Sequence, residues 1–246
     1  MQSTVDKPLV GVLCWEAGSV PMGLLQLELL PGNSTNPETY QNLCRVQFSR
    51  IKGANVHTIL ENPCKNVLAA MIDEGRRLVE QEGAVAITTS CGFNAVNQPQ
   101  LAAAIPVPVF SSSLLQVPAL ALATGRKVGI ITASAKHLTA EHLRNAGITE
   151  GIPVVVKGLD DCPEWQKLHK YPNDRLDLSV IEDYLVQMAR KLQQSDGVGS
   201  LLLECTDLPP FAERLRQETS LPVADYVSML HWLLKCVPGG GACRGL

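Results

Sequence analysis

Two stretches of the sequence, GAVAITTSC (83–91) and GVGSLLLEC (197–205), share one layout. Each opens on a glycine, continues as a largely apolar run, and reaches a cysteine eight residues after the glycine. A proline follows each cysteine by seventeen residues, at Pro108 in VPVF and at Pro222 in LPVA. The agreement in order, type and spacing favours two similar halves in which Cys91 and Cys205 hold equivalent positions.

Other apolar runs extend this pattern along the chain. VGVLC begins at Val10 and VGIIT begins at Val128, so each half opens on a similar segment. Helical patterns lie between the runs, and this alternation is typical of parallel sheets joined by right-handed helical crossovers. The sequence therefore predicts an α/β fold of two pseudo-symmetric Rossmann-like lobes, with the active site in the cleft between them. Parallel strands are expected near residues 8–14, 54–60, 83–89, 127–132, 152–156 and 199–204.

The boundaries of the two lobes follow from where the second half starts. The run at 128 begins a fresh α/β unit after VPVF, while YVSMLHWLLKC (226–236) has an apolar face that needs the first lobe to cover it. We therefore expect residues 1–112 together with 224–246 to form the first lobe, and residues 113–223 to form the second.

Composition narrows the function classes. The chain has 246 residues, is 46% hydrophobic and has a net charge of −3, and it has no basic stripe that would bind nucleic acid. No apolar run is long enough to span a membrane, and eight cysteines without a CxxC pair indicate reduced thiols and no metal site. We expect a cytoplasmic protein with a small-molecule partner; a homo-oligomer is compatible with the sequence, which does not fix the oligomeric state.

The expected position of the two cysteines suggests chemistry. Ligands of open parallel sheets bind outside the carboxyl ends of the strands, so Cys91 and Cys205 should face a shared cleft. The helix that starts after each cysteine should lower the pKa of the thiol toward neutrality. One thiolate could then remove a proton from the α-carbon of a small acid while the other thiol delivers a proton to the opposite face.

The two cysteine motifs resemble those of the aspartate/glutamate racemase superfamily. TTSCGF (88–93) and LLLECTDLPP (201–210) carry the resemblance, and NPETY (36–40) is similar to a segment of poorly characterised members. The superfamily includes amino-acid and hydantoin racemases, maleate isomerases and arylmalonate decarboxylases. The resemblance implies two α/β lobes with the site between them and racemisation by Cys91 and Cys205 without a cofactor.

The first motif departs from the superfamily pattern, which has Cys-Asn-Thr where this chain has Cys91-Gly92-Phe93. Backbone amides, helped by Asn94, would replace the usual side-chain contacts, and Trp15 would make the pocket larger and more apolar. The carboxyl groups of Glu16, Glu204 and Asp207 are expected to be solvated at the surface. The expected substrate-binding residues are Ser90, Gly92, Phe93, Asn94, Ser134 and Thr206.

These observations predict a cofactor-independent racemase or epimerase of an amino acid or related small carboxylate. Two alternatives stay open. One is a cis–trans isomerase of a maleate-like diacid, in which one cysteine adds covalently to the alkene. The other is a non-catalytic protein that uses the thiol pair for redox switching or ligand sensing. The substrate and its stereochemistry are not fixed by the sequence.

Overall fold

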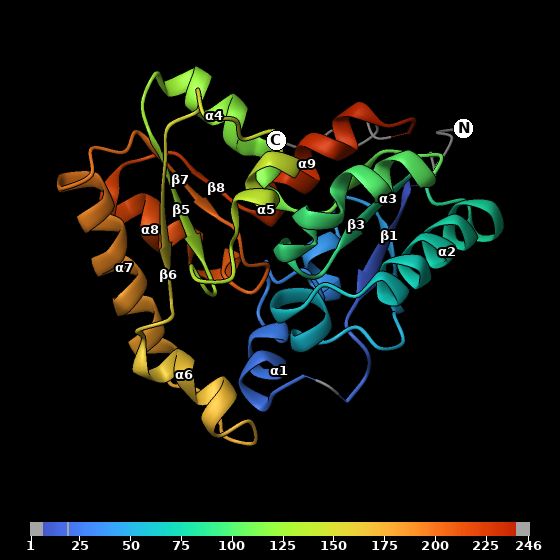
Figure 1. Ribbon diagram of the computed structural model, residues 1–246, viewed down its shortest axis with the longest axis horizontal. Coiled ribbons are helices and arrows are strands. Elements are labelled where there is room, and N and C mark those ends of the chain that lie inside the picture. The colour runs from blue at the N-terminus through green and yellow to red at the C-terminus, as the bar shows by residue number, and fades with distance from the viewer. Residues whose placement is uncertain (1–6, 19, 240–246) are drawn as a thin grey trace, which may run out of the picture.

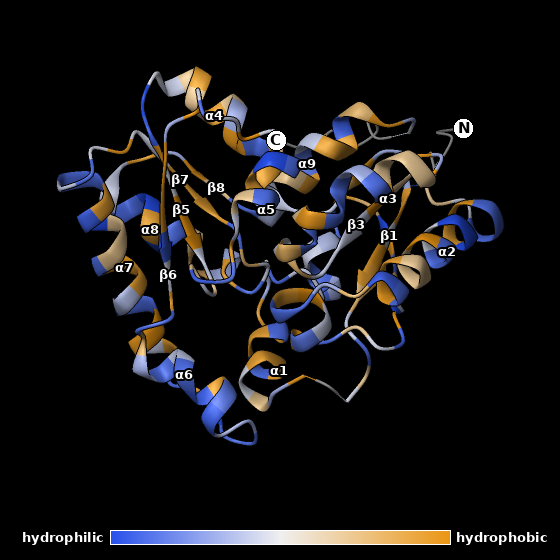
Figure 2. Cartoon of the chain, viewed as in Figure 1, coloured by the Kyte–Doolittle hydropathy of each residue, from blue (hydrophilic) through white to orange (hydrophobic). Residues whose placement is uncertain are grey.

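The computed structural model describes residues 7–18 and 20–239. It contains two four-stranded sheets whose strands are all parallel, and Figure 1 shows them side by side with helices around them. The predicted α/β architecture of two lobes is confirmed. Figure 2 shows apolar strands inside and helices whose polar faces point outward, which is the pattern expected when both faces of a parallel sheet are covered.

The first sheet has the strand order β2-β1-β3-β4. Its strand β1 pairs with β2 and β3 along its length, with Val10 opposite Val46 on one side and Ala86 on the other. The strands are β1 (Leu9–Cys14), β2 (Arg45–Arg50), β3 (Ala86–Thr89) and β4 (Val109–Phe110), and the helices of this half are α1 (Met22–Glu28), α2 (Lys65–Glu82) and α3 (Gln98–Ala104).

The second sheet repeats this topology in the order β6-β5-β7-β8. Its central strand β5 lies between β6 and β7, with Val128 opposite Val154 and Ser200. The strands are β5 (Val128–Thr132), β6 (Val154–Gly158), β7 (Ser200–Leu203) and β8 (Val223–Ala224), and the helices are α4 (Val117–Thr124), α5 (Ala140–Asn145), α6 (Pro163–Lys170), α7 (Leu178–Gln194) and α8 (Ala212–Thr219).

Local signals in the sequence set the ends of the helices. Thr139 caps α5 in a capping box with His142, and Asp177 caps α7 by accepting the N–H of Ser179. Gly83 ends α2 with φ +73°, a left-handed conformation that glycine adopts without strain. Residues at their boundaries therefore account for the start of α5 and α7 and for the end of α2.

One expected strand is wrong. Residues 54–60 form no strand; the segment His57–Glu61 is a π-helical turn, preceded by Asn55, whose side chain accepts the N–H groups of His57 and Thr58. The strand is β2, which lies at the sheet edge and has one buried residue among exposed and partly buried ones. An edge strand lacks the continuous apolar run of a buried strand, so the sequence does not mark β2 as a strand.

Helix α9 (Tyr226–Cys236) packs against the first sheet. Met229, Leu230 and Leu233 are buried in one apolar cluster with Val10 and Val12 of β1. This packing is compatible with the expected return of the chain to the first lobe, while the boundaries at 112 and 224 stay a prediction. In the part of the chain that the structure describes, no helix combines the length and apolar character needed to cross a membrane.

Candidate active site

The two cysteines follow equivalent strands. Cys91 is the second residue after β3, and Cys205 is the second residue after β7, the strands that neighbour the central strand of each sheet. Each cysteine starts a tight turn, and the backbone N–H two residues on, of Phe93 or Asp207, donates to the sulfur and lowers the pKa of the thiol. The repeat seen in the sequence is thus a repeat of local geometry.

The two strand ends are held together by a row of contacts that we call the seam. Thr206 Oγ1 donates to the carbonyl oxygen of Ser90 at 2.6 Å, and Ser113 Oγ donates to the carbonyl oxygen of Leu203 at 2.7 Å. Gly92 lies directly against Glu204. These contacts fix the two cysteine turns relative to each other.

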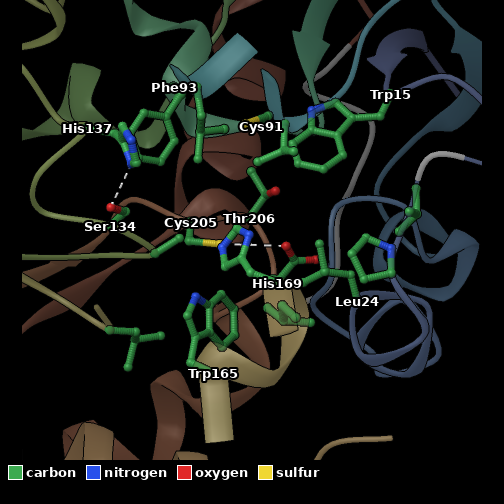
Figure 3. A pocket seen from close by; sticks show the side chains of 18 of the residues that line it. Trp15, Leu24, Cys91, Phe93, Ser134, His137, Trp165, His169, Cys205 and Thr206 are labelled. Atoms are coloured by element: carbon green, nitrogen blue, oxygen red, sulfur yellow. Dashed lines mark hydrogen bonds between the residues drawn. The ribbon is translucent and has the colours of Figure 1, made fainter. Parts of the chain in front are cut away.

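Both thiols open on one cavity of about 710 Å³ above the seam, and Figure 3 shows the side chains that surround it. Both cysteines are free and 8% exposed. Side chains from both lobes complete the wall, among them Trp15, Leu24, Phe93, Trp165 and His169.

The structure brings most of the predicted binding residues to this cavity. Ser90, Gly92, Phe93, Ser134 and Thr206 line it with the two cysteines. Phe93 also packs edge to face on His142 of α5, with ring centroids 5.5 Å apart.

Asn94 lies elsewhere. It is buried away from the lining residues, and its Oδ1 accepts a hydrogen bond from Asn97 Nδ2 at 3.3 Å. Cys14, the last residue of β1, is buried in an apolar cluster and does not line the cavity.

Ser134 belongs to a polar cluster at the carboxyl ends of β5 and β6. Its Oγ donates to Asp160 Oδ1 at 2.5 Å and lies 2.9 Å from His137 Nδ1, while Asp160 Oδ2 accepts the N–H of Ala135 at 2.6 Å. Sequence reasoning missed Asp160 and His137, although Asp160 is the second residue after the parallel strand β6, at the strand end where ligand-binding residues gather.

The thiols are less acidic than the helix argument predicts. Burial raises the pKa of Cys91 and of Cys205 well above the usual value for a thiol, and nearby carboxyl groups raise it further. The backbone N–H groups act in the expected direction, but desolvation outweighs them. The expected shift toward neutrality is therefore wrong.

Two carboxyl groups expected at the surface flank Cys205 instead. Glu204 is fully buried, and burial raises its pKa to about 7. Asp207 lines the cavity, burial raises its pKa to about 6, and it accepts hydrogen bonds from Asn33 Nδ2 at 2.7 Å and from Cys205 Sγ at 3.6 Å. A carboxyl group that follows a buried parallel strand lies at the edge of the sheet where ligands bind. This position is the signal in the sequence that argues against a solvated surface carboxylate.

Charge and aromatic surface complete the cavity. Arg50, Lys136 and Lys170 supply positive charge, which can hold a carboxylate, and Trp15 and Trp165 supply flat apolar surface. Among residues 7–18 and 20–239, no group of three His, Cys, Asp or Glu side chains is placed to hold a metal ion. The arrangement can hold a small acid between two thiols on opposite lobes.

Known proteins resemble this chain in sequence and in fold. The family described as "Asp/Glu/Hydantoin racemase" matches residues 65–234, which span both cysteine turns. Among solved structures, the allantoin racemase from Pseudomonas fluorescens superposes with a TM-score of 0.65 at 15% identity, covering 92% of this chain and 89% of that one. An aspartate racemase homologue from Pyrococcus horikoshii OT3 gives 0.59 at 17% identity, covering 92% and 97%. At these identities the likeness shows the fold.

Sequence relatives carry a different activity in their name. Dimethylsulfoniopropionate lyase 3 of Emiliania huxleyi (strain CCMP1516) is 28% identical over 167 residues, which is 63% of this chain and 43% of the relative. The match thus spans less than half of the relative's length.

Proposed function

This chain belongs to the Asp/Glu/Hydantoin racemase family, and from that membership we propose that it is a cofactor-independent racemase or epimerase of an amino acid or related small carboxylate. Cys91 and Cys205 are its proton-transfer groups. The observation that carries the proposal is the pair of thiols at equivalent strand ends, both open to one cavity.

The reaction needs one base and one acid on opposite faces of the substrate. A thiolate at one cysteine takes the proton of the α-carbon, so that a C–H bond breaks as an S–H bond forms. The thiol of the other cysteine gives its proton to the opposite face, and the roles exchange in the reverse direction. Positive side chains such as Arg50 and Lys136 would hold the substrate carboxylate and stabilise the charge that develops on it.

The raised pKa of the thiols suits this task in one respect. A thiolate that is costly to form is a strong base, and the α-proton of a carboxylate is weakly acidic. Positive charge that enters with the substrate, such as an α-ammonium group, would favour the thiolate once the cavity is filled.

The test is exchange of the α-proton in deuterated water, followed by NMR over amino acids, hydantoins and hydroxy acids, with chiral chromatography to detect racemisation. Cys91→Ser and Cys205→Ser should each abolish racemisation, because a serine hydroxyl is far too weak an acid to serve as the base near neutral pH. Cys64→Ser is the matched control, since Cys64 is a free thiol away from the cavity. A Cys91 or Cys205 variant that racemises at nearly the wild-type rate would overturn the proposal.

A second candidate is elimination from a carboxylate that carries a cationic leaving group at its β-carbon. The relatives named dimethylsulfoniopropionate lyase favour it, as do the aromatic rings of Trp15, Phe93 and Trp165, whose faces attract cations. One thiolate would remove the α-proton, the C–H electrons would form the double bond, and the leaving group would depart with its own bonding pair.

Elimination is distinguished by its products. Incubation with dimethylsulfoniopropionate, with dimethyl sulfide measured in the headspace, tests it directly. Elimination needs one base, so one of the two single-cysteine variants should retain it, whereas racemisation is lost in both. Release of dimethyl sulfide without racemisation of any screened acid would select the lyase.

A further inference from the structure

Glu204 carries a polar atom that the fold leaves unused. Its Oε2 accepts a hydrogen bond from Thr132 Oγ1 at 2.7 Å, but its Oε1 is buried and has no partner among the described residues. A buried polar atom without a partner costs free energy that an apolar side chain would not. Its presence one residue before Cys205 calls for a role beyond packing.

The carboxyl group of Glu204 reaches across the seam to the other cysteine. A Cβ at position 92 would lie 2.3 Å from Glu204 Oε1 and 2.2 Å from its carbonyl oxygen, so the side chain fills the space that any residue but glycine would need. Gly92 follows Cys91 directly. The second lobe thus places a carboxyl group against the peptide that carries the first lobe's thiol.

We propose that Glu204 is a positioning residue for Cys91: its carboxyl group supports the Cys91–Gly92 peptide from the opposite lobe and controls, through its own charge, when the Cys91 thiol can release its proton. The inference rests on the proposed role of Cys91 in proton transfer.

Electrostatics gives the direction of this control. Ionised Glu204 is a buried negative charge beside Cys91, and it raises the pKa of that thiol more than any other charge does. Neutral Glu204 lacks this effect. The titratable groups that face Glu204 are Cys91, Cys205 and Asp207, and only Asp207 adds a charge that raises the pKa of Glu204. Because the pKa of Glu204 is about 7, the control operates near neutral pH.

The experiment measures the thiols without any substrate. The folded protein is treated with iodoacetamide between pH 7 and 9.5, and the modification rates of Cys91 and Cys205 are read by peptide mass spectrometry. Glu204→Gln keeps the size of the side chain and removes its charge, so Cys91 should react about tenfold faster at pH 8.5, the effect of one pKa unit.

Asp207→Asn is the crossed control, because Asp207 is the first charge that raises the pKa of Cys205 and a lesser one for Cys91. It should speed the reaction of Cys205 more than that of Cys91, while Glu204→Gln does the reverse.

A second variant leaves Glu204 in place. Thr132→Val removes the hydrogen bond that lowers the pKa of Glu204. Glu204 then stays neutral to a higher pH, and Cys91 should react about two- to threefold faster than in wild type at pH 7.5. This difference in rate should become smaller toward pH 9, where Glu204 is ionised in both proteins.

Three outcomes overturn the inference: an unchanged rate at Cys91 in Glu204→Gln, an equal gain at both thiols in every variant, or no labelling of either thiol. The proposed function fails separately. If the Cys91→Ser protein still racemises, the proposed function is wrong even when Glu204→Gln changes the labelling rate. If Cys91→Ser is inactive but Glu204→Gln leaves the labelling rate unchanged, only the inference about Glu204 is wrong.

Discussion

The two cysteine turns share one geometry and differ in charge. The first reads SCGF (90–93) and holds no ionisable side chain besides its thiol, whereas the second reads ECTD (204–207) and holds two carboxyl groups. Both turns follow equivalent strands and both direct a backbone N–H at the sulfur. Pseudo-symmetry of the fold therefore supplies two matched positions, and the residues on either side make them chemically unequal.

The immediate neighbours of each sulfur show what the inequality does. Trp15 lies in the cavity wall with Cys91 and acts to lower the pKa of its thiol, but burial and the charge of Glu204 outweigh this effect. Cys205 Sγ donates to Asp207 Oδ2, a contact that requires the sulfur to keep its proton. Under the proposed function, this contact favours Cys205 as the thiol that acts first as acid and leaves Cys91 to act first as base.

The largest expected effect comes from replacing one cysteine of the pair and keeping the other. Cys91→Ser and Cys205→Ser should each lower racemisation by about 10³-fold or more, because each removes proton transfer on one face. With a β-substituted substrate analogue, each variant should still eliminate the leaving group from one of the two enantiomers. The two variants should act on opposite enantiomers. Product formation followed by NMR measures this. Identical enantiomer preference in the two variants would contradict the assignment of one thiol to each face.

The charge difference should appear in the pH dependence of stability. The pKa of Glu204 rises on folding from 4.5 to about 7, so the folded state binds more protons than the unfolded state between those values. The free energy of unfolding then falls as pH rises through this window. Glu204→Gln should therefore gain stability relative to wild type between pH 4 and pH 8 by on the order of 3 kcal/mol.

Urea unfolding at several pH values measures this gain. Ser90→Ala, at the equivalent position of the first lobe, is the matched control, because it removes no titratable group and should leave the pH dependence as in wild type. A constant difference between Glu204→Gln and wild type from pH 4 to pH 8 would show that Glu204 titrates normally.

Hydrogen bonds of the seam that lie next to the thiols should matter more for activity than those farther away. Thr206→Val removes the 2.6 Å hydrogen bond to the carbonyl oxygen of Ser90, and Ser113→Ala removes the 2.7 Å bond to that of Leu203. Each loss should lower the free energy of unfolding by about 1–2 kcal/mol. The α-proton exchange rate should fall further in Thr206→Val, because that bond joins the two cysteine turns; equal losses of activity would deny the seam a positioning role.

The sequence predicts the features that recur. Repeated spacing places Cys91 and Cys205 at equivalent strand ends, and capping residues such as Thr139 set helix ends, because these signals act within a few residues. The edge strand β2 escapes prediction because it lacks an apolar run. The burial of Glu204 also escapes it, since a glutamate beside an apolar strand looks solvated until the other lobe covers it.

The rest of the cavity wall depends on contacts between segments far apart in the chain. Trp165 and His169 come from α6, and Leu24 comes from α1 on the other side of the cavity. No local pattern marks these residues, because their role arises only when the two lobes meet. Conversely, Asn94 lies next to a predicted site in the sequence and turns away from the cavity in the fold.

The smallest expected effect tests how far the two lobes act as one site. Helix α1 precedes most of the first lobe in sequence but buries Leu27 among second-lobe residues. Gln26 ties it there, because its Nε2 donates to the carbonyl oxygen of Leu176 at 3.1 Å and its Oε1 accepts the N–H of Leu176 at 3.0 Å. Both bonds are partly exposed, so Gln26→Ala should cost only about 1 kcal/mol of unfolding free energy.

The effect of Gln26→Ala on catalysis should separate binding from chemistry. Loosening α1 disturbs the wall that Leu24 and Glu28 form and leaves the hydrogen bonds of the seam in place. We therefore expect KM to rise about threefold with kcat unchanged, the signature of a contact made equally in ground and transition states. Gln47→Ala, at an exposed position of β2, should change neither constant. A fall in kcat for Gln26→Ala would mean instead that the α1 contact helps to align the two thiols, and that the cysteine turns are not positioned by the seam alone.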